Sequence, residues 1–318
     1  MAINTIEAAQ IFMKALDQQM IEGATSGWME ANSGRVKYSG GNTVKIPSIS
    51  TSGLADYDRD VGYNQGSVSL TYESKTMTKD RGRQFLLDRI EVDESNFIAN
   101  ATAVMSEFQR MQIIPEVDAY RYSKIYALAE NKSEYTPAAS TIVTALNKDI
   151  TAIYDSAGAA DLVITMPYTV ADILDTNEKF NRYLNVSNFK QGGIDISVKT
   201  FNGVPVIRVP SARMKTAYVF NDGKTEGQTS GGFAPTESAS QINWIICPRN
   251  VLIAISKTDN FKIFDPNVNQ KADAWLIQYR KFHDLWIKDD DRSLVRVSAT
   301  PAPKKTDPVT ETGSEEQT

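Results

Sequence analysis

Cysteine and histidine are almost absent from this 318-residue chain, which has one of each, Cys247 and His283. A single cysteine cannot form an intramolecular disulfide, and it cannot supply a zinc site that needs several thiolates. We therefore expect neither a disulfide framework nor a metal centre. The scarcity of cysteine also fits a chain that is made in a reducing cytosol.

Long apolar runs are also missing. No stretch approaches the 18 consecutive apolar residues of a membrane-spanning helix, and the amino end has the pattern of a polar helix rather than a signal peptide. We expect neither export by this route nor attachment to a membrane. A net charge of -5 gives no broad basic surface for gripping duplex DNA, although a mildly acidic protein can still enclose nucleic acid.

The usual catalytic motifs do not occur. The sequence has no G-x-x-x-x-G-K-[ST], no G-x-G-x-x-G, no H-E-x-x-H and no G-x-S-x-G. His283 sits in an apolar strand pattern, which favours a satisfied structural histidine over a general base. Cys247 follows an apolar run and is interpreted as a small buried hydrophobe, while the aspartates at residues 289–291 are typical of a solvated turn. We predict no catalytic, cofactor-binding or metal site, and hence no enzyme.

Residues 93–130 form the strongest helical pattern of the chain, with Pro115 between its two halves. The proline removes a backbone donor and disfavours α geometry in the residue before it, so we expect a kink or a short break there. With both halves helical, this spine helix would span roughly 55 Å. A 4-3-4-3 spacing predicts that the buried face of the first half is made by Phe97, Ala101, Val104, Phe108 and Met111. The second half repeats the helical spacing at Ala119, Tyr122, Tyr126 and Ala129.

The amino end predicts a short amphipathic helix. Asn4 and Glu7 have the spacing of a capping box, and apolar residues then recur with helical period. Two interpretations stay open at this stage. The helix could pack on the core of its own chain, or it could form an arm that packs on a neighbour.

Residues 35–78 predict a long β ribbon, with strands at 35–38, 43–49 and 67–78. Neither face of the returning strand stays apolar to its end, so the ribbon has little core of its own. Because an isolated two-stranded ribbon is marginal in water, we expect it to rest on something else, and another subunit is the candidate. The intervening residues 50–66 are rich in Gly, Tyr and paired charges, which is typical of an exposed tip.

The rest of the chain mixes helices and strands, as an α+β fold does. Helices are expected at 138–154, with Ile142, Leu146, Ile150 and Ile153 as the buried stripe, and at 169–176. Asn202-Gly203 is a strong signal for a type I′ hairpin between strands at 194–201 and 204–209. Further strands are expected at 161–166, 217–220, 242–246, 251–255, 274–287 and 294–297. Residues 221–240 are expected to form an exposed loop, and residues 299–318 a disordered tail because they have almost nothing to bury.

The order of these elements resembles that of the major capsid proteins of tailed bacteriophages with the Hong Kong 97 fold. The resemblance is strongest in the amino-acid sequence of four segments: GLADYDRDVGY (53–63), TKDRGRQFLLDRIEVDE (78–94), IIPEVDAYRYSK (113–124) and QYRKFHDLWI (278–287). The resemblance runs over about residues 1–298. It implies an α+β capsid fold with an amino-terminal arm, an extended loop, a peripheral domain and an axial domain.

The resemblance also implies a domain layout. It places the amino-terminal arm at 1–34, the extended loop at 35–81, the peripheral domain with the spine helix at 82–131, the axial domain at 132–260, the return to the peripheral domain at 261–298, and the tail at 299–318. In this layout the tip of the extended loop makes the inter-subunit contact through Leu54, Tyr57, Asp58, Arg59 and Tyr63. The spine helix core is made by Phe97, Val104, Phe108 and Met111.

The function implied is that of a major capsid protein. Such a protein self-assembles as hexamers and pentamers into the icosahedral shell of a virion and encloses double-stranded DNA without sequence-specific binding. Assembly in the bacterial host cytoplasm and a portal protein as partner are also implied. A separate scaffolding protein is expected, since no long helical extension of the kind that acts as a built-in scaffold precedes the arm. No cofactor is expected. Two alternatives stay open: a nanocompartment shell of the encapsulin type, and a cytosolic enzyme acting at the glycine-rich loop near Gly231 and Gly232.

Overall fold

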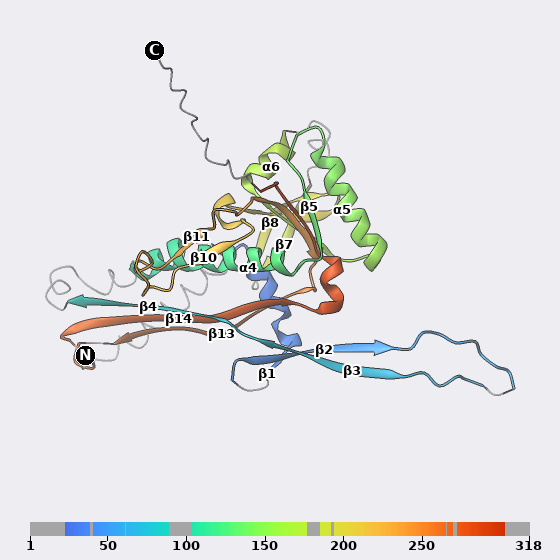
Figure 1. Cartoon of the computed structure of the whole chain (residues 1–318), viewed down its shortest axis with the longest axis horizontal. Coiled ribbons are helices and arrows are strands. Elements are labelled where there is room, and N and C mark those ends of the chain that lie inside the picture. Colours follow the sequence, from blue (N-terminus) through green and yellow to red (C-terminus); the bar gives the residue numbers. More distant parts are fainter. Residues whose placement is uncertain are drawn as a thin grey trace, which may run out of the picture.

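A computed structural model of the chain describes residues 23–38, 41–60, 62–88, 104–176, 185–191, 194–264, 266–269 and 272–302. A compact unit of helices and strands sits above a long, narrow sheet, and a β ribbon projects beyond the body at one end of the longest axis (Figure 1). The predicted amino-terminal helix, Phe97, Ala101 and the tail from residue 303 lie outside the described residues.

The compact unit is built on a mixed sheet that has seven strands within the described residues, in the order β5-β15-β12-β6-β9-β8-β7. The pairs β6–β9 and β15–β5 are parallel, and the other neighbours are antiparallel. The strands are β5 (Asn131–Glu134), β6 (Leu162–Pro167), β7 (Asn185–Gln191), β8 (Ile194–Phe201), β9 (Val204–Val209), β12 (Ile242–Pro248) and β15 (Arg296–Ala299). Together with the helices, this sheet confirms the predicted α+β class.

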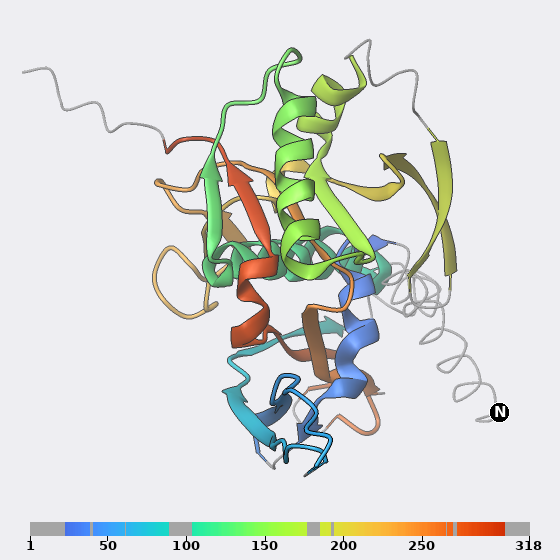
Figure 2. The same ribbon diagram turned by 90° about the vertical axis from the view of Figure 1, so that its right-hand side faces the viewer.

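Helices cover both faces of this sheet. On one face α5 (Ile142–Ala157) and α6 (Tyr168–Asp175) pack against alternate residues of β6 and β12, among them Ile164 and Trp244 (Figure 2). On the other face the spine helix packs against the residues between them, such as Val163 and Ile245. Both central strands are therefore buried on two sides, which is why their sequences are continuous apolar runs. The predicted stripe of α5 is confirmed: Ile142, Leu146, Ile150 and Ile153 are all buried.

The turn between β8 and β9 is the predicted type I′ hairpin. Asn202 has a φ of 50° and Gly203 a φ of 80°, and Phe201 pairs directly with Val204. Asparagine and glycine are the residues that tolerate this left-handed backbone, so the local sequence determines the turn. The edge strands β5 and β7 were not expected, because neither sequence alternates clearly between apolar and polar residues.

The second sheet is long and has the order β13-β14-β4 within the described chain. Its strands are β13 (Leu252–Phe264), β14 (Ala274–Ile287) and β4 (Lys79–Asp88). β14 has the predicted bounds, whereas β4 was not predicted as a strand. Gly82 lies opposite Arg280 in this pair, and a Cβ at position 82 would lie 2.9 Å from the Tyr279 carbonyl oxygen. The close approach of the two backbones explains why a glycine stands in the middle of a strand.

The spine helix is not broken at Pro115. Residues 104–108 are helical, a π-helical turn comes next at Gln109–Ile113, and α4 continues from Ile114–Leu128. The backbone of Ile114 is itself helical, with φ of -59° and ψ of -49°. The irregularity expected near the proline is therefore a wide turn just before it. A π turn accommodates one additional residue within the helix and rotates the side chains of the later turns about the helix axis.

The structure corrects part of the predicted spine core. Val104 and Met111 are 40% and 52% exposed, while the neighbouring Met105 is buried. Phe108 is half-buried and lies edge-on to Phe85, with ring centroids 5.0 Å apart. The prediction assumed an uninterrupted α-helical period. The face that is actually buried is displaced by about one residue from the predicted face.

The amino-terminal segment of the described chain packs on its own subunit. It includes η1 (Gly27–Arg35), whose Trp28 and Met29 are buried in the main core. The buried carboxylate of Asp118 on the spine helix accepts hydrogen bonds from the Ser26 hydroxyl at 2.6 Å and the Thr25 hydroxyl at 2.9 Å. Residues 23–35 are thereby fixed to the spine helix. Whether the chain packs on its own core or on a neighbour stays open only for the helix predicted before residue 23.

The remaining elements connect these units. They are η3 (Ser211–Arg213), β10 (Tyr218–Phe220), β11 (Phe233–Pro235) and η4 (Asp289–Leu294). β10 and β11 pair within the region expected to be partly loop. The aspartates at residues 289–291 open η4 after β14, and the strand expected at 294–297 is β15, which joins the seven-stranded sheet instead of returning along β14.

Candidate inter-subunit interface

The ribbon consists of β1 (Lys37–Tyr38), β2 (Thr43–Thr51) and β3 (Val68–Thr76), as the sequence predicted. Its base packs on the body of the same chain. Val44 and Ile46 are fully buried against β13 and β14, in a cluster that includes Phe282 and Trp286. The expectation that the whole ribbon lacks apolar partners of its own is therefore wrong for the base. Those partners lie about two hundred residues away in the sequence, so no local pattern could have shown them.

The apolar side of the ribbon changes face beyond Ile46. Residues directly opposite each other in an antiparallel pair share a face, and the register pairs Pro47 with Tyr72, Ile49 with Leu70, and Thr51 with Val68. Pro47, Ile49, Val68, Leu70 and Tyr72 thus form one row, which we call the distal stripe. Four of its side chains are exposed: Ile49 by 69%, Val68 by 76%, Leu70 by 52% and Tyr72 by 43%.

The opposite face of the distal ribbon is polar. Ser48 pairs with Thr71 and Ser50 with Ser69 on that face. The base and the distal half of one ribbon therefore have their apolar faces on opposite sides. The apolar face of the base is covered by the chain itself, and the apolar face of the distal half is exposed to solvent. An exposed, contiguous apolar row rimmed by polar residues is typical of a surface that binds another macromolecule.

Asp58 and Gly62 close a turn at the tip of the ribbon. Asp58 and Gly62 exchange backbone hydrogen bonds of 3.2 and 2.8 Å, and the Asp58 carboxylate accepts a bond of 2.7 Å from the Asp60 N–H. Tyr57 and Tyr63 meet edge-on with ring centroids 5.0 Å apart, and both are exposed. Of the predicted tip residues, the structure brings these two tyrosines together. It places Asp58 within the turn and leaves Leu54 and Arg59 on the exposed surface.

The root of the ribbon is held by a buried carboxylate on β14. Asp284 accepts hydrogen bonds from the Thr78 N–H at 2.9 Å and the Thr78 hydroxyl at 3.1 Å. It also accepts bonds from the Tyr120 hydroxyl at 2.7 Å and the Lys124 ammonium at 2.6 Å, both on the spine helix. Burial, together with the charge of Asp284, raises the pKa of Tyr120, so the hydroxyl stays a donor at ordinary pH. The direction in which the ribbon leaves the body is therefore tied to the spine helix.

A second polar contact ties β4 to the spine helix. The Arg81 guanidinium donates to Glu116 on the helix at 2.7 Å and to the carbonyl of Asn221 at 2.7 Å. Beside it the Lys79 ammonium lies 3.7 Å from the centre of the Phe220 ring. Burial, with a smaller contribution from Arg81, lowers the pKa of Lys79. The loop after β10 is thus fixed to the same helix as the ribbon.

Sequence reasoning missed this polar root. Asp284 lies within the apolar segment FHDLWI, and a charged residue inside a buried strand is a signal that it has partners. Its partners Thr78 and Lys124, however, are more than 150 residues away along the chain. The residue could have been noticed from the sequence, but its role could not.

The two residues considered for chemistry are both buried. Burial raises the pKa of the Cys247 thiol to about 12, so it is protonated and unreactive at neutral pH. Burial, followed by the charges of Arg121 and Lys281, holds the pKa of His283 well below its usual value. The sequence predicted a structural histidine with all its hydrogen bonds made. His283 is buried as predicted, but its Nδ1 has no hydrogen-bond partner in the described structure.

Within the described residues, no group of three His, Cys, Asp or Glu side chains is arranged to hold a metal ion. None of the described helices has both the length and the apolar character needed to cross a bilayer.

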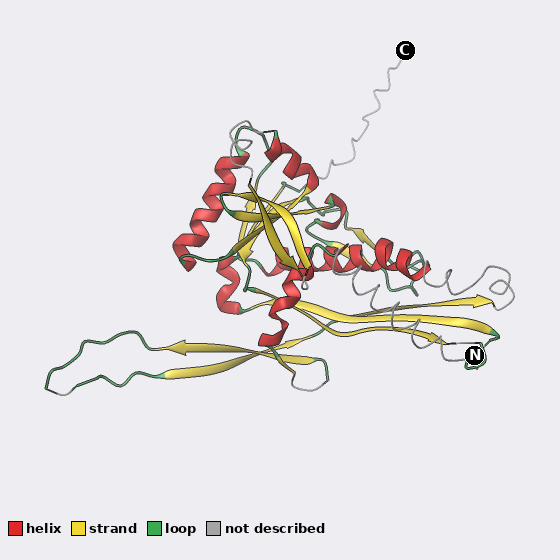
Figure 3. Ribbon diagram, turned by 180° about the vertical axis from the view of Figure 1, so that it is seen from behind, coloured by secondary structure: helices red, strands yellow, loops and turns green. Residues whose placement is uncertain are grey.

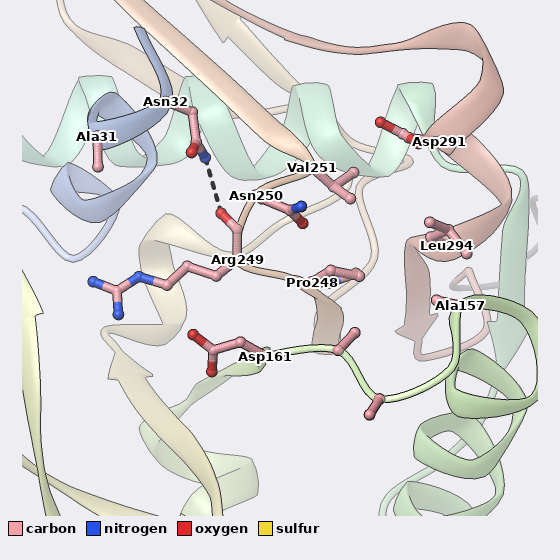
Figure 4. A pocket seen from close by; sticks show the side chains of 12 residues that line it. Ala31, Asn32, Ala157, Asp161, Pro248, Arg249, Asn250, Val251, Asp291 and Leu294 are labelled. Carbon is pink, nitrogen blue, oxygen red and sulfur yellow. Dashed lines mark hydrogen bonds between the residues drawn. The ribbon is translucent and has the colours of Figure 1, made fainter. Parts of the chain in front are cut away.

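A cleft of about 600 Å³ opens where η1 and the end of α5 approach η4 (Figure 4). Its walls include Ala31, Ala157 and Leu294, and the Asn32 amide donates to the Arg249 carbonyl oxygen at 2.9 Å across one side. The Arg249 side chain extends away from Leu294 and lies over the Phe189 ring, 4.6 Å from its centre. Four of the residues that line the cleft are alanines, and we call it the alanine cleft.

Comparison with known proteins identifies the fold. No protein-family model and no curated protein matches the sequence. Among solved structures, the mature capsid of bacteriophage PhiM1 matches with a TM-score of 0.53 at 9% identity, over 82% of this chain and 82% of that chain. The capsid of Cyanophage P-SCSP1u matches with a TM-score of 0.53 at 8% identity, over 83% and 85%. A virus-like particle from Pyrococcus furiosus matches with a TM-score of 0.50 at 13% identity, over 90% and 96%.

At such low identities these likenesses establish the fold. The chain has the fold of tailed-phage capsid proteins, which confirms the fold predicted from the sequence and is consistent with its Hong Kong 97 type.

Proposed function

We propose that this chain is the major capsid protein of a tailed phage or prophage, and that it assembles as hexamers and pentamers into a closed icosahedral shell around double-stranded DNA. The observation that carries the proposal is the distal stripe, an apolar row on a projecting ribbon that the chain itself leaves uncovered. Covering one large apolar side chain contributes about 1.5 to 3 kcal/mol, so a row of four is a substantial driving force for association.

The proposed domain layout is based on the arrangement of the elements. Residues 1–34 form the arm, 35–81 the extended loop, 82–131 and 261–298 the peripheral domain, 132–260 the axial domain, and 299–318 the tail. The long sheet under the spine helix supports the assignment of the peripheral domain. The seven-stranded sheet between α5 and α4 supports the assignment of the axial domain.

The extended loop is proposed to make the principal contact with the adjacent subunit. Its tip residues Leu54, Tyr57, Asp58, Arg59 and Tyr63 are placed at the far end of the ribbon. Hydrogen bonds within the tip join Asp58 to Gly62 and Asp60 to Asp58, so the described part of the tip has a turn of its own to present to a partner.

The other partners are proposed from the fold class. The shell would enclose double-stranded DNA without sequence-specific contacts, would carry a portal protein at one vertex, and would be assembled in the host cytoplasm with a separate scaffolding protein. The role is structural: the subunit needs no cofactor, no membrane and no catalytic residue.

Negative-stain electron microscopy of the purified, expressed chain tests the proposal. Closed shells of uniform diameter are the expected result, with the protein eluting in the void volume of a size-exclusion column. A monomer or dimer under a range of salt and protein concentrations, with or without a coexpressed scaffolding protein, would contradict it.

A nanocompartment shell is the second candidate, and the likeness to the virus-like particle from Pyrococcus furiosus is the observation that favours it. The two functions differ in what the shell contains. Particles purified from the native source should hold double-stranded DNA if the chain is a phage capsid protein, and a protein cargo without DNA if it is a nanocompartment.

A further inference from the structure

The turn between β8 and β9 carries a chemistry that the proposed function does not use. Asn202-Gly203 is the only Asn-Gly pair in the sequence. Both of its residues are exposed, whereas Phe201 and Val204 on either side of them are buried. Helix α5 covers this face of the seven-stranded sheet (Figures 2 and 3), and its core side chains share a cluster with Phe201 and Val204. The turn is therefore a solvated corner of a well-packed hairpin.

Asparagine is a thermolabile residue, and one that precedes glycine can lose its side-chain amide without an enzyme. A base in the solvent removes the Gly203 N–H proton, and the nitrogen attacks the Cγ of Asn202 within the same chain. The bond from Cγ to Nδ2 breaks, Nδ2 takes up a proton, and ammonia leaves a five-membered cyclic imide. Water then opens the imide. Addition at the side-chain carbonyl gives aspartate, and addition at the main-chain carbonyl gives isoaspartate.

Two features of the turn leave the attacking nitrogen accessible. Within the described chain the Gly203 N–H has no hydrogen-bond acceptor, since the hairpin ladder closes at the pair Phe201 and Val204. Apart from its two chain neighbours, no described residue has an atom within 4 Å of the place where a Cβ at position 203 would lie. A side chain there would shield the nitrogen, but the φ of 80° favours glycine.

One contact opposes the attack. The Asn202 Nδ2 donates a hydrogen bond of 2.7 Å to the Oδ1 of Asn147 on α5. The adjacent Leu146 is fully buried, so the helix holds this acceptor in place. While the bond is made, the Asn202 carboxamide is oriented by α5, and its Cγ is not free to turn towards the Gly203 nitrogen.

We propose that Asn202 is a site of spontaneous deamidation, to aspartate and isoaspartate, and that Asn147 slows the reaction by holding the Asn202 carboxamide against α5. The inference does not depend on the proposed shell function. An aspartate at position 202 keeps the turn, because the Asn147 amide can rotate and donate to the new carboxylate. Isoaspartate instead adds one main-chain atom to a turn whose length sets the register of β8 and β9.

Peptide mapping measures the reaction directly. Trypsin cleaves after Lys199 and Arg208, and the peptide between them, residues 200–208, contains Asn202 as its single side-chain amide. The purified chain is kept at 37 °C and pH 8, and mass spectrometry of this peptide follows the conversion of the amide to a carboxyl group. The synthetic peptide 200–208, incubated alongside, is the unrestrained reference. Conversion in the folded chain should be detectable, and slower than in the free peptide by about fivefold or more.

Substitutions on α5 test the role of Asn147. Asn147→Ala removes the acceptor and should raise the rate at Asn202 about fivefold, as the loss of one neutral hydrogen bond allows. Asn147→Asp keeps an acceptor oxygen, so its rate should stay within twofold of the wild-type rate. The matched control is Thr151→Ala, an exposed position one turn further along α5, which should also stay within twofold. All three variants should keep the circular dichroism spectrum and the Tm of the wild type.

The two products are separated by their stability. Asn202→Asp should unfold in a single transition within two degrees of the wild-type Tm, whereas a chain aged until it contains isoaspartate should show a second transition at lower temperature. No conversion at Asn202 in the wild type and in Asn147→Ala would overturn the site. Equal rates in the wild type and Asn147→Ala, or a wild type as fast as the free peptide, would overturn the role of Asn147. Shell formation by the same preparations is scored separately, so these outcomes are independent of the proposed function.

Discussion

The buried carboxylate of Asp284 accepts hydrogen bonds from both the backbone N–H and the hydroxyl of Thr78, at 2.9 and 3.1 Å. Thr78 is the residue at which the ribbon returns to the body, and Asp284 also binds Tyr120 and Lys124 of the spine helix. The orientation of a projecting loop is thus determined by a contact inside the core. The proposed shell function requires such a contact, because a ribbon of this length turns a small rotation at its root into a large displacement at its tip.

Removing this carboxylate should be severe. Asp284→Ala leaves the Lys124 ammonium and the Thr78 and Tyr120 donors without their acceptor, and breaking a buried ion pair in this way costs about 3 to 5 kcal/mol. We expect a loss of that size in the free energy of unfolding of the unassembled subunit, measured by urea denaturation. The control is Asp155→Ala on the exposed side of α5, which should change it by less than about 0.5 kcal/mol. Similar stabilities for both variants would show that the root is not fixed by Asp284.

The corrected spine face gives a second prediction. Phe108→Ala removes a ring that packs on Phe85 and Tyr279, at centroid distances of 5.0 and 6.4 Å. Because Phe108 is only half-buried, the loss in unfolding free energy should be about 2 kcal/mol, below the 3 to 5 of a fully buried phenylalanine. Val104→Ala, one turn earlier and exposed, should cost less than about 0.5 kcal/mol in the same urea titration. Equal losses at both positions would restore the face that the sequence predicted.

The Cys247 thiol should be inert in the folded chain. Its pKa is raised to about 12 by burial, so at pH 8 it is protonated and out of reach of iodoacetamide, and mass spectrometry should find alkylation only after unfolding. The unfolded thiol loses its proton at a lower pH than the folded one, so the contribution of this group to stability should decline as the pH rises from about 9 towards 12. Cys247→Ala should remove that part of the pH dependence. Rapid alkylation of the native protein at pH 8 would contradict the burial.

The distal stripe gives a test with a control one residue away. Leu70→Asp places a charge on the exposed apolar row, whereas Ser69→Asp places it on the opposite, polar face of the same strand. Neither change touches the core, so the Tm of the unassembled subunit should shift by no more than one or two degrees in both. Only Leu70→Asp should prevent closed shells, as judged by sedimentation. Assembly of both variants, or of neither, would show that the stripe is not the contact face.

Local sequence patterns predicted the elements whose structure depends least on residues far away along the chain. The stripe of α5 results from helical period, the Asn202-Gly203 turn from turn chemistry, and the bounds of β14 from apolar residues at alternate positions of a long segment. β4 was missed because its sequence KDRGRQFLLD alternates poorly, and it is a strand because β14 pairs with it along its length. The displaced spine face has a similar cause, since the residues that bury Met105 belong to β4 and β14 and the spacing of apolar residues in the helix does not show them.

The candidate interface was predicted only in part, because local patterns showed the tip and pairing with distant residues determines the rest. The tip was recognisable from its glycines, tyrosines and paired charges, and the polar end of β3 indicated an incomplete core. The register between β2 and β3 was needed to show that Ile49, Val68, Leu70 and Tyr72 share one face. The base and the root depend on β13, β14 and the spine helix, which contribute residues from distant parts of the chain.

Electron microscopy of two proteins prepared side by side tests the central claim most directly: the wild-type chain, and a variant in which residues 50–66 are replaced by a short Gly/Ser turn. The variant keeps the base of the ribbon, the Asp284 root and the whole core, so it should be soluble with unchanged helix content. We predict closed shells from the wild type and none, or very few, from the variant. Normal closed shells from the variant, or unassembled subunits from the wild type, would contradict the account.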